Sequence, residues 1–300
     1  MDKIVVTGAN GQLGNELRAI EREGLYGGRY VFVFTDVAEL DITDRESVSR
    51  FVAAERPRWI INAAAYTAVD RAEEDAARAE LLNATAVEHL VSAAAAVGAG
   101  FVQVSTDYVF DGRMPEDRHA LSETAAVGPQ SVYGRTKLKG EEYALAYPKS
   151  LVVRTAWLYS TYGNNFVKTM LRLGAEREEL GVVADQWGTP TYAADLAAAL
   201  MRMVSVCDER AAAGAGSEGL FGLYHYTNEG VTTWCEFAQE IMRRGGRSCT
   251  VRGITSAEYP AAAPRPAWSV LSKHKIAHTF DIQIPSWQDS LARCLQALLK

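Results

Sequence analysis

The chain has 300 residues, 48% of them hydrophobic, and can therefore bury a large core as one compact unit or as two closely coupled lobes. Its formal net charge of −6 argues against nucleic acid or an anionic membrane surface as a partner. Four cysteines lie far apart without a CxxC pair, and no stretch has the pattern of a targeting signal or a membrane span, which indicates a soluble cytoplasmic protein with reduced thiols.

Short apolar runs alternate with helical patterns through the first half of the chain. Strands are predicted at Lys3–Val6, Tyr30–Phe34, Trp59–Asn62, Phe101–Ser105 and Leu151–Arg154. Helices are predicted at Leu13–Glu23, Arg45–Glu55, Ala76–Val97 and Ser131–Tyr147, with Thr43 and Glu46 as a capping box for the second. The strand runs are continuously apolar, which is typical of a sheet covered on both faces. The fold class is therefore α/β, a Rossmann-type doubly wound parallel sheet.

A glycine cluster separates the first predicted strand from the first helix. Such a turn needs glycine for the tight bend, for the approach of a pyrophosphate to the backbone, and for close helix–strand packing. The N–H groups at the helix start then favour phosphate. Ordinary turns also use glycine, but this one lies between an apolar strand and an amphipathic helix, and it predicts a dinucleotide site. Its residues are Gly8, Asn10, Gly11, Gln12, Leu13 and Gly14.

Three further segments extend this predicted coenzyme site. Asp36 ends the second strand and can accept both ribose hydroxyls of NAD while repelling a 2′-phosphate, which favours NADH over NADPH unless Asp36 is a surface turn residue. Asp41 and Ile42 fit either an adenine pocket or a solvated helix lead-in. The small side chains after the third strand let a coenzyme lie against the backbone, although close packing would also explain them; this segment is Ala63, Ala64, Ala65, Tyr66 and Thr67.

Hydroxyl and acidic side chains follow the fourth strand, and a Tyr/Lys pair follows on a helix. Thr106 and Asp107 would face the crevice at the carboxyl edge of the sheet, where Thr106 can donate to a substrate carbonyl; a simple turn is the alternative. Tyr133 and Lys137 are four residues apart and share one helix face. A phenol has a pKa of about 10, which a nearby ammonium would lower towards neutrality. Lys137 could also hold the nicotinamide ribose.

The regular alternation of predicted strands and helices ends after about residue 155. Helices are predicted at Asn165–Arg177, Ala193–Val204 and Trp287–Leu299, with a strand at Gly181–Ala184 and a loop at Asp208–Gly219. We expect residues 1–155 to form a dinucleotide-binding domain, with segments near 181–204 and 220–228 returning to it. Residues 156–180 and 229–300 would form a smaller, mostly helical substrate lobe.

These motifs together carry a family resemblance. The glycine turn, Asn62–Asp70, Ser105–Gly112 and Tyr133–Glu141 resemble the extended short-chain dehydrogenase/reductase family. Similarity continues through Arg154–Tyr159, Gly163–Phe166, Asp185–Pro190, Gly222–His225, Arg265–Pro266 and Ile284–Trp287, so that it covers essentially the whole chain.

The resemblance implies an NAD(P)H-dependent reductase that acts on the 4-keto group of a dTDP-linked sugar. Its catalytic residues would be Tyr133 as the proton donor, Lys137, Thr106 and Asp107. Its further substrate contacts would be Val69, Asp70, Trp157 and Arg265, with the Trp157 indole against the apolar face of the sugar. A homodimer is compatible with the family. Some members are described with magnesium at a dimer contact, but this sequence offers no matching carboxylate cluster, and we predict no metal.

Two other functions fit parts of this pattern. One is a catalytically idle dinucleotide-binding protein, like the regulatory subunit of methionine adenosyltransferase, although Tyr133, Lys137 and Thr106 are all present. The other is an epimerase or dehydratase of the extended family. Dehydratases need a second carboxylate beside Asp107, and Tyr108 stands there instead.

Overall fold

Six parallel strands form the central sheet of the computed structural model, which describes residues 1–216 and 218–299. They are β1 (Asp2–Thr7), β2 (Tyr30–Thr35), β3 (Trp59–Asn62), β4 (Gly100–Thr106), β5 (Ser150–Thr155) and β10 (Gly222–His225), in the order β10-β5-β4-β3-β1-β2. The predicted parallel α/β sheet is confirmed. Because β2 and β3 lie on opposite sides of β1, a crevice opens at the carboxyl ends of β1 and β3.

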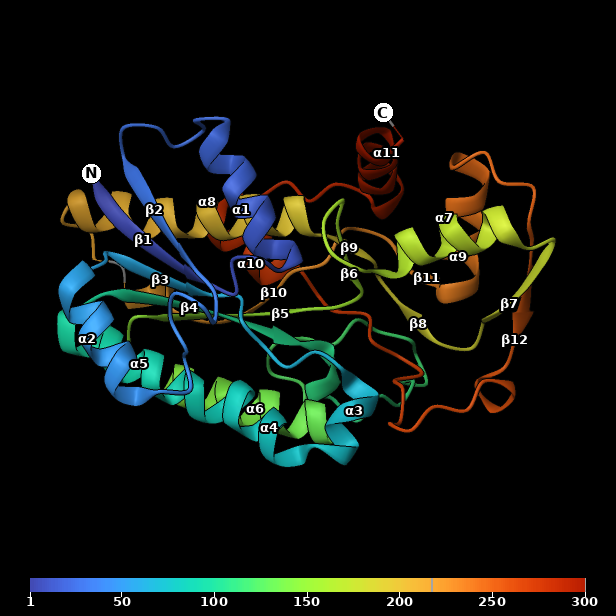
Figure 1. Cartoon of the computed structure of the whole chain (residues 1–300), viewed down its shortest axis with the longest axis horizontal. Coiled ribbons are helices and arrows are strands. Elements are labelled where there is room, and N and C mark those ends of the chain that lie inside the picture. Colours follow the sequence, from blue (N-terminus) through green and yellow to red (C-terminus); the bar gives the residue numbers. More distant parts are fainter. Residues whose placement is uncertain (217, 300) are drawn as a thin grey trace.

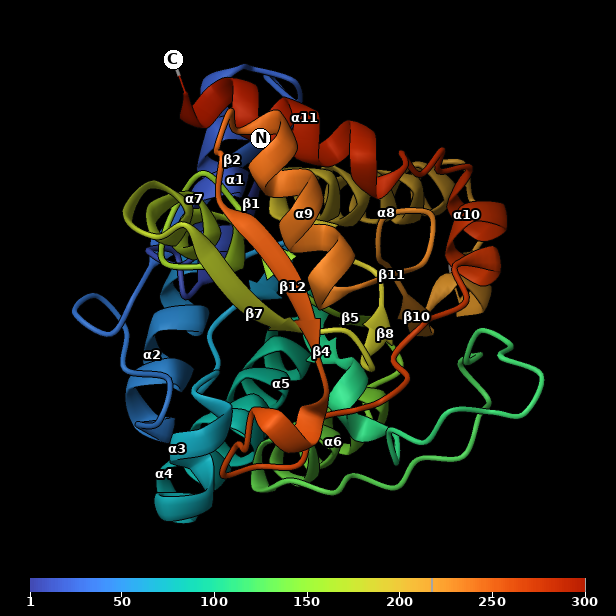
Figure 2. The same cartoon turned by 90° about the vertical axis from the view of Figure 1, so that its right-hand side faces the viewer.

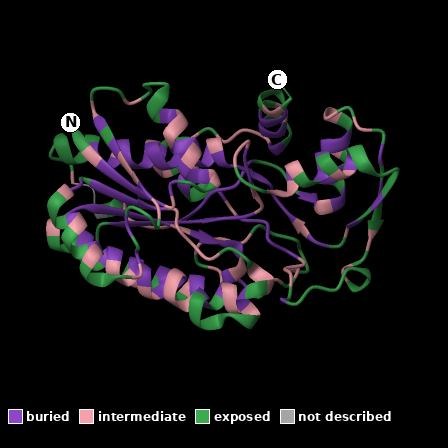
Figure 3. Ribbon diagram, viewed as in Figure 1, coloured by how far each residue is buried: buried purple, intermediate pink, exposed green. Residues whose placement is uncertain are grey.

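Helices cover both faces of this sheet (Figure 1). On one face lie α2 (Arg45–Glu55), α5 (Ala86–Val97) and α6 (Val132–Leu145), and on the other α1 (Gln12–Arg22), α8 (Ala193–Ala212) and α10 (His274–Phe280). Alternate residues of β1 enter the two cores: Val5 packs with Val48 of α2, whereas Ile4 and Val6 pack with Leu200 of α8. Both faces are buried, as Figure 3 shows, which explains the continuously apolar strands.

The predicted helix at Ala76–Val97 contains an irregularity. It consists of α4 (Ala76–Glu80), a π-helical turn (Leu81–Thr85) and α5, preceded by the short α3 (Val69–Glu74). The extra residue in the turn directs the buried Asn83 inwards, and π-turns of this kind often occur at functional sites.

Two local predictions were wrong. The N-cap of α2 is Asp44, which accepts from the N–H groups of Glu46 and Ser47, whereas the Thr43 hydroxyl donates to Asp41 at 2.6 Å. Helix α8 continues to Ala212 and thus through the start of the predicted loop, because the buried Asp208 carboxylate accepts from the Tyr30 hydroxyl at 2.8 Å and the Trp59 indole at 3.0 Å. Ser217, in the remainder of that loop, lies outside the described residues.

A smaller lobe stands beside the carboxyl edge of the sheet. It contains α7 (Phe166–Glu176), α9 (Trp234–Arg244) and α11 (Trp287–Leu298), together with β7 (Glu179–Val183) paired with β12 (Thr250–Ile254). Figure 2 shows β12 beside β7 with α9 next to them. Their buried side chains form a separate core around Phe237.

Connecting segments tie the lobe to the sheet. Strand β6 (Leu158–Tyr159) pairs with β9 (Thr191–Tyr192), and β8 (Trp187–Gly188) pairs with β11 (Thr232–Thr233). Strand β7 lies in the lobe and α10 packs on the sheet domain, so that the chain passes between the two parts more often than the expected boundaries suggest. No helix among the described residues is long and apolar enough to cross a membrane.

Candidate active site

A cleft of about 1240 Å³ lies between the carboxyl edge of the sheet and the small lobe. This volume exceeds that of a typical single-ligand pocket, and two ligands could lie end to end. Of the residues predicted from the sequence, those that line it are Gly8, Gly11, Gln12, Leu13, Asp36, Asp41, Ile42, Ala63, Ala64, Ala65, Thr67, Val69, Thr106, Asp107, Tyr133, Lys137, Trp157 and Arg265. Asn10, Gly14, Tyr66 and Asp70 are not among the residues that line the cleft.

The glycine turn brings the backbone to the wall of the cleft. Gly8 has a φ of +67°, and a Cβ there would lie 2.6 Å from the Ala64 nitrogen. A Cβ on Gly14 would lie 2.5 Å from the Ala9 Cα, so Gly14 serves helix–strand packing behind the cleft. Gly11 is the N-cap of α1 and has no side chain to bond the first N–H groups. Those donors and the helix dipole form the kind of cradle that a pyrophosphate requires.

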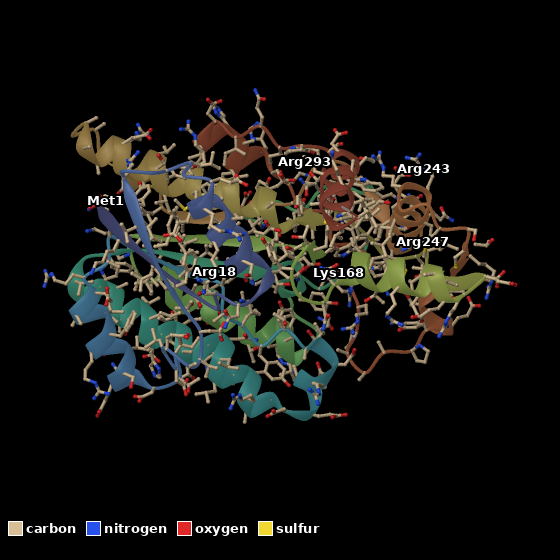
Figure 4. The ribbon with its side chains drawn as sticks, turned by 45° about the horizontal axis from the view of Figure 1, so that its top comes forward. Met1, Arg18, Lys168, Arg243, Arg247 and Arg293 are labelled. Carbon is tan, nitrogen blue, oxygen red and sulfur yellow. The ribbon has the colours of Figure 1, made fainter. Side chains whose placement is uncertain are left out.

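Asp36 joins the glycine turn to the end of β2. Its carboxylate accepts from the Asn10 N–H at 3.0 Å and the Val37 N–H at 2.8 Å. In this contact with Asp36, Asn10 contributes its backbone N–H. Arg18 of α1, labelled in Figure 4, has its guanidinium carbon 4.2 Å from the centroid of the Phe34 ring. The Arg18 guanidinium therefore packs on the ring of Phe34, a residue of β2.

Asp41 and Ile42 form the far end of the same wall. The Thr43 hydroxyl and N–H both donate to Asp41, and these bonds lower the pKa of its carboxyl group. Arg78 of α4 lowers it further by its charge and also lines the cleft. Nothing in the sequence around Arg78 had pointed to it, because it lies in an ordinary charged helical stretch.

The alanine segment after β3 is held from behind by Asn83 of the π-helical turn. The Asn83 side chain accepts from the Tyr66 N–H at 2.8 Å and donates to the Tyr66 carbonyl at 3.1 Å. It also donates to the Thr136 hydroxyl on α6 at 3.1 Å. Asn83 therefore fixes the segment against the helix that carries Tyr133. Sequence reasoning missed it, because an asparagine inside an apparently regular helix carries no signal.

Tyr133 and Lys137 occupy the first two turns of α6, whose N-cap is Ser131. The Lys137 ammonium donates to the Val104 carbonyl at 2.6 Å. Burial lowers the pKa of Lys137 to about 8, although the charge of Glu141 acts to raise it. Burial raises the pKa of Tyr133 to about 12, with a hydrogen bond to Thr106 lowering it and the charge of Asp107 raising it. The expectation that Lys137 brings the pKa of Tyr133 towards neutrality is therefore wrong, because burial of the phenol dominates.

A buried ion pair joins Glu141 of α6 to Arg154 of β5. Glu141, one turn after Lys137, accepts from the Arg154 guanidinium at 2.6 Å and from the Ser105 hydroxyl at 2.5 Å. The two charged side chains are 1% and 3% exposed. The Ser105 hydroxyl is thus bound into this network, and both Ser105 and the next residue along β4, Thr106, line the cleft.

Thr106 and Asp107 form a turn that also belongs to the cleft wall. The Thr106 hydroxyl donates to Asp107 at 3.0 Å and accepts from the Tyr108 N–H at 3.3 Å. Both interpretations of this motif, a strand-ending turn and a cleft-facing pair, therefore apply. Burial raises the pKa of the Asp107 carboxyl group to about 6.

Three aromatic side chains, Trp157, Phe166 and Trp234, form an aromatic wall of the cleft beside the small lobe. Trp157 has a φ of +49°, an uncommon backbone conformation for a bulky residue. Its ring lies on that of Trp234, with centroids 3.7 Å apart and planes 12° from parallel. One face of the Trp157 indole is thus covered by Trp234, the first residue of α9. No pattern in the sequence indicated this contact, because Trp157 and Trp234 lie far apart in the chain.

A segment of the C-terminal region, residues 261–266, borders one side of the cleft. Arg265 donates to Asp70 at 2.5 Å, and the Ala263 N–H donates to the same carboxylate at 3.0 Å. Arg265 therefore reaches the cleft while Asp70 stays behind it as an anchor. Val69, next to Asp70, lines the cleft itself.

Among residues 1–216 and 218–299, no group of three or more His, Cys, Asp or Glu side chains could hold a metal ion. That no metal takes part stays a prediction.

The family profile described as "RmlD substrate binding domain" matches residues 1–300. A dTDP-4-dehydrorhamnose reductase from Aggregatibacter actinomycetemcomitans is 41% identical over 298 residues, covering 97% of each chain.

Solved structures agree with the sequence relatives. A dTDP-4-dehydrorhamnose reductase from Clostridium acetobutylicum is 42% identical with a TM-score of 0.89, over 99% of this chain and 100% of that chain. The Bacillus anthracis reductase, solved in complex with NADP, is 39% identical with a TM-score of 0.89 over 99% of both chains.

Proposed function

The chain belongs to the RmlD family of dTDP-4-dehydrorhamnose reductases, and we propose that it reduces the 4-keto group of dTDP-4-dehydro-L-rhamnose with NAD(P)H to give dTDP-L-rhamnose. The observation that carries this proposal is the meeting of three features in one cleft. The glycine turn lies at one end, the aromatic wall of the small lobe at the other, and Thr106, Tyr133 and Lys137 line the same cleft.

The coenzyme half of the cleft fits a nicotinamide dinucleotide. The backbone N–H groups after Gly11 would hold the pyrophosphate, Asp36 the adenosine ribose, and Asp41 with Ile42 the adenine. The alanine segment would leave room for the nicotinamide end, and Lys137 would bind its ribose. When bound, the reduced coenzyme supplies the hydride that the keto carbon accepts.

Tyr133 is the proposed acid of the reaction. Its raised pKa keeps the phenol protonated at neutral pH, as donation to a developing alkoxide requires. The Thr106 hydroxyl, next to the phenol, would donate to the same substrate oxygen and stabilise its growing charge. Trp157 and Trp234 would pack on the sugar, and Val69 and Arg265 would bound it from the side, with Asp70 holding Arg265 in place.

Oxidation of the coenzyme in the presence of the keto sugar tests the proposal. We expect loss of reduced-coenzyme absorbance with dTDP-4-dehydro-L-rhamnose in a panel of dTDP- and UDP-linked keto sugars. Tight coenzyme binding without oxidation would favour the idle regulatory alternative. Conversion of the sugar without net oxidation would favour an epimerase or dehydratase, which recycle the coenzyme.

We also propose a coenzyme preference, an oligomeric state and a location. A carboxylate at Asp36 favours NADH, whereas the Bacillus anthracis relative was solved with NADP. A homodimer, a cytoplasmic location and the two-part division of the chain follow from the family and the composition. Sedimentation analysis of the purified protein would test the dimer.

A further inference from the structure

Asp107 is a buried acid whose second oxygen has no assigned role. The residue begins the 3₁₀ turn Asp107–Val109 and is 3% exposed. Its Oδ1 accepts from the Thr106 hydroxyl, but its Oδ2 is fully buried and has no hydrogen-bond partner among the described residues. An unpaired buried carboxylate oxygen is costly when charged and much less so when the group is protonated. Burial therefore raises the pKa of Asp107, so that more of the acid form is present near neutral pH than for an exposed carboxyl group.

The groups around Asp107 offset part of this preference: hydrogen bonds from Thr106, Ser269 and the backbone N–H groups of Asp107 and Tyr108 lower its pKa, which burial still holds at about 6. Tyr133 faces it from α6, Tyr108 follows it on the same turn, and Ser269 approaches from the C-terminal segment. The Ser269 hydroxyl lowers the pKa of Asp107 but donates to the Trp187 carbonyl at 3.3 Å. The Arg265 charge acts on Tyr108, and the Lys137 ammonium donates to Val104.

Thr106 connects this acid to the proposed proton donor. Its hydroxyl donates to Asp107 at 3.0 Å and shares a hydrogen bond with the Tyr133 phenol. A hydroxyl between two acids can take a proton from one and pass its own to the other. The pKa of Asp107 is about 6 and that of Tyr133 about 12, so proton transfer from the carboxyl group to a phenolate runs strongly downhill.

We propose that Asp107 returns the proton to Tyr133 after each reduction, through the Thr106 hydroxyl. The inference rests on the proposed reductase function. As the keto carbon accepts hydride and the coenzyme is oxidised, the Tyr133 O–H bond breaks and its proton forms the new hydroxyl. Thr106 then gives its proton to the phenolate and takes the proton of Asp107. The Asp107 carboxylate, at the cleft wall, regains a proton from water once the product leaves.

Rapid mixing of the wild-type protein with coenzyme and keto sugar tests this relay. From about pH 5 to pH 7 both Tyr133 and Lys137 keep their protons, so the first turnover should vary less than about threefold over this range. Later turnovers need the acid form of Asp107, which falls about tenfold with each pH unit above its pKa. A burst of one oxidised coenzyme per site should therefore grow above pH of about 6. First and later turnovers that change together with pH would overturn the relay.

The Asp107→Asn variant sharpens the test. The amide cannot supply the proton, and we expect a burst at every pH with later turnovers at least about tenfold slower than in the wild type. Asp111→Asn removes the same charge four residues on from an exposed site and should behave as the wild type. An equal loss in the first and later turnovers of Asp107→Asn would mean a role in substrate placement and contradict the proposal.

The readouts also separate the relay from the function on which it rests. No oxidation in the first turnover of the wild type would overturn the reductase and the relay with it. A first turnover without a burst at any pH would overturn the relay alone. Coenzyme affinity shows whether Asp107→Asn is folded, and the wild-type pH series stands if it is not.

Discussion

The two halves of the cleft are built in different ways. The coenzyme half is made of backbone: the glycine turn, the alanine segment and the start of α1 come from strand ends that follow one another in the chain. The substrate half is made of large side chains from distant segments, with Trp157 on Trp234 and Arg265 on Asp70. A backbone surface suits a ligand shared by many enzymes, whereas a side-chain surface is easily changed to suit a particular sugar.

The largest expected effect lies where the halves meet. Tyr133→Phe removes the proposed proton donor and should lower kcat by about 10²- to 10⁴-fold while coenzyme affinity is retained. Stopped-flow turnover and fluorescence titration with NADH measure the two quantities. Tyr143→Phe, on the same helix but away from the cleft, is the control. Near-normal turnover in Tyr133→Phe would remove the proposed acid.

Loss of the buried ion pair between Glu141 and Arg154 should lower the stability of the fold that carries both halves of the cleft. Glu141→Gln leaves the Arg154 charge buried without its partner, which should cost about 3–5 kcal/mol of unfolding free energy. Urea unfolding measures this loss, and Glu142→Gln, at an exposed neighbouring position, should stay within about 0.5 kcal/mol of the wild type. Similar stability in the two variants would show that the pair is dispensable.

A change in the aromatic wall should affect the substrate half alone. Trp234→Ala exposes one face of Trp157 and should raise the KM for the nucleotide sugar about tenfold, since an aromatic contact contributes up to about 1.5 kcal/mol. The dissociation constant for coenzyme should not change. Trp234→Phe retains a ring and should recover most of the affinity. An equal rise in both constants would mean that Trp234 only stabilises the lobe.

The smallest expected effect concerns the choice of coenzyme. Asp36→Asn removes the charge that would repel a 2′-phosphate, and kcat/KM for NADPH relative to NADH should rise by about three- to tenfold. The amide oxygen can still accept from the Asn10 N–H, so the turn should keep its shape. Glu21→Gln, at an exposed position of α1 that does not line the cleft, is the matched control. An unchanged ratio would show that Asp36 does not face the ribose.

The prediction from sequence was most successful where a local pattern fixes the geometry. The strands of the first half and their parallel pairing followed from apolar runs, and Gly8 and Gly14 lie where a bulkier residue would collide with the backbone. It was wrong about the cap of α2 and the end of α8. In each case a neighbouring side chain decided the outcome: Asp44 competed with Thr43, and the partners of Asp208 extended the helix.

The sequence by itself therefore determined the sheet, the glycine turn and the Tyr/Lys helix face, because each depends on residues close together in the chain. Only the tertiary structure decided the rest. It brought Asn83 behind the alanine segment, placed Trp234 on Trp157, and surrounded Tyr133 with enough protein to raise the pKa that the sequence pattern alone predicted to fall. Burial and contacts between distant segments depend on how the whole chain packs, and no short stretch of sequence records them.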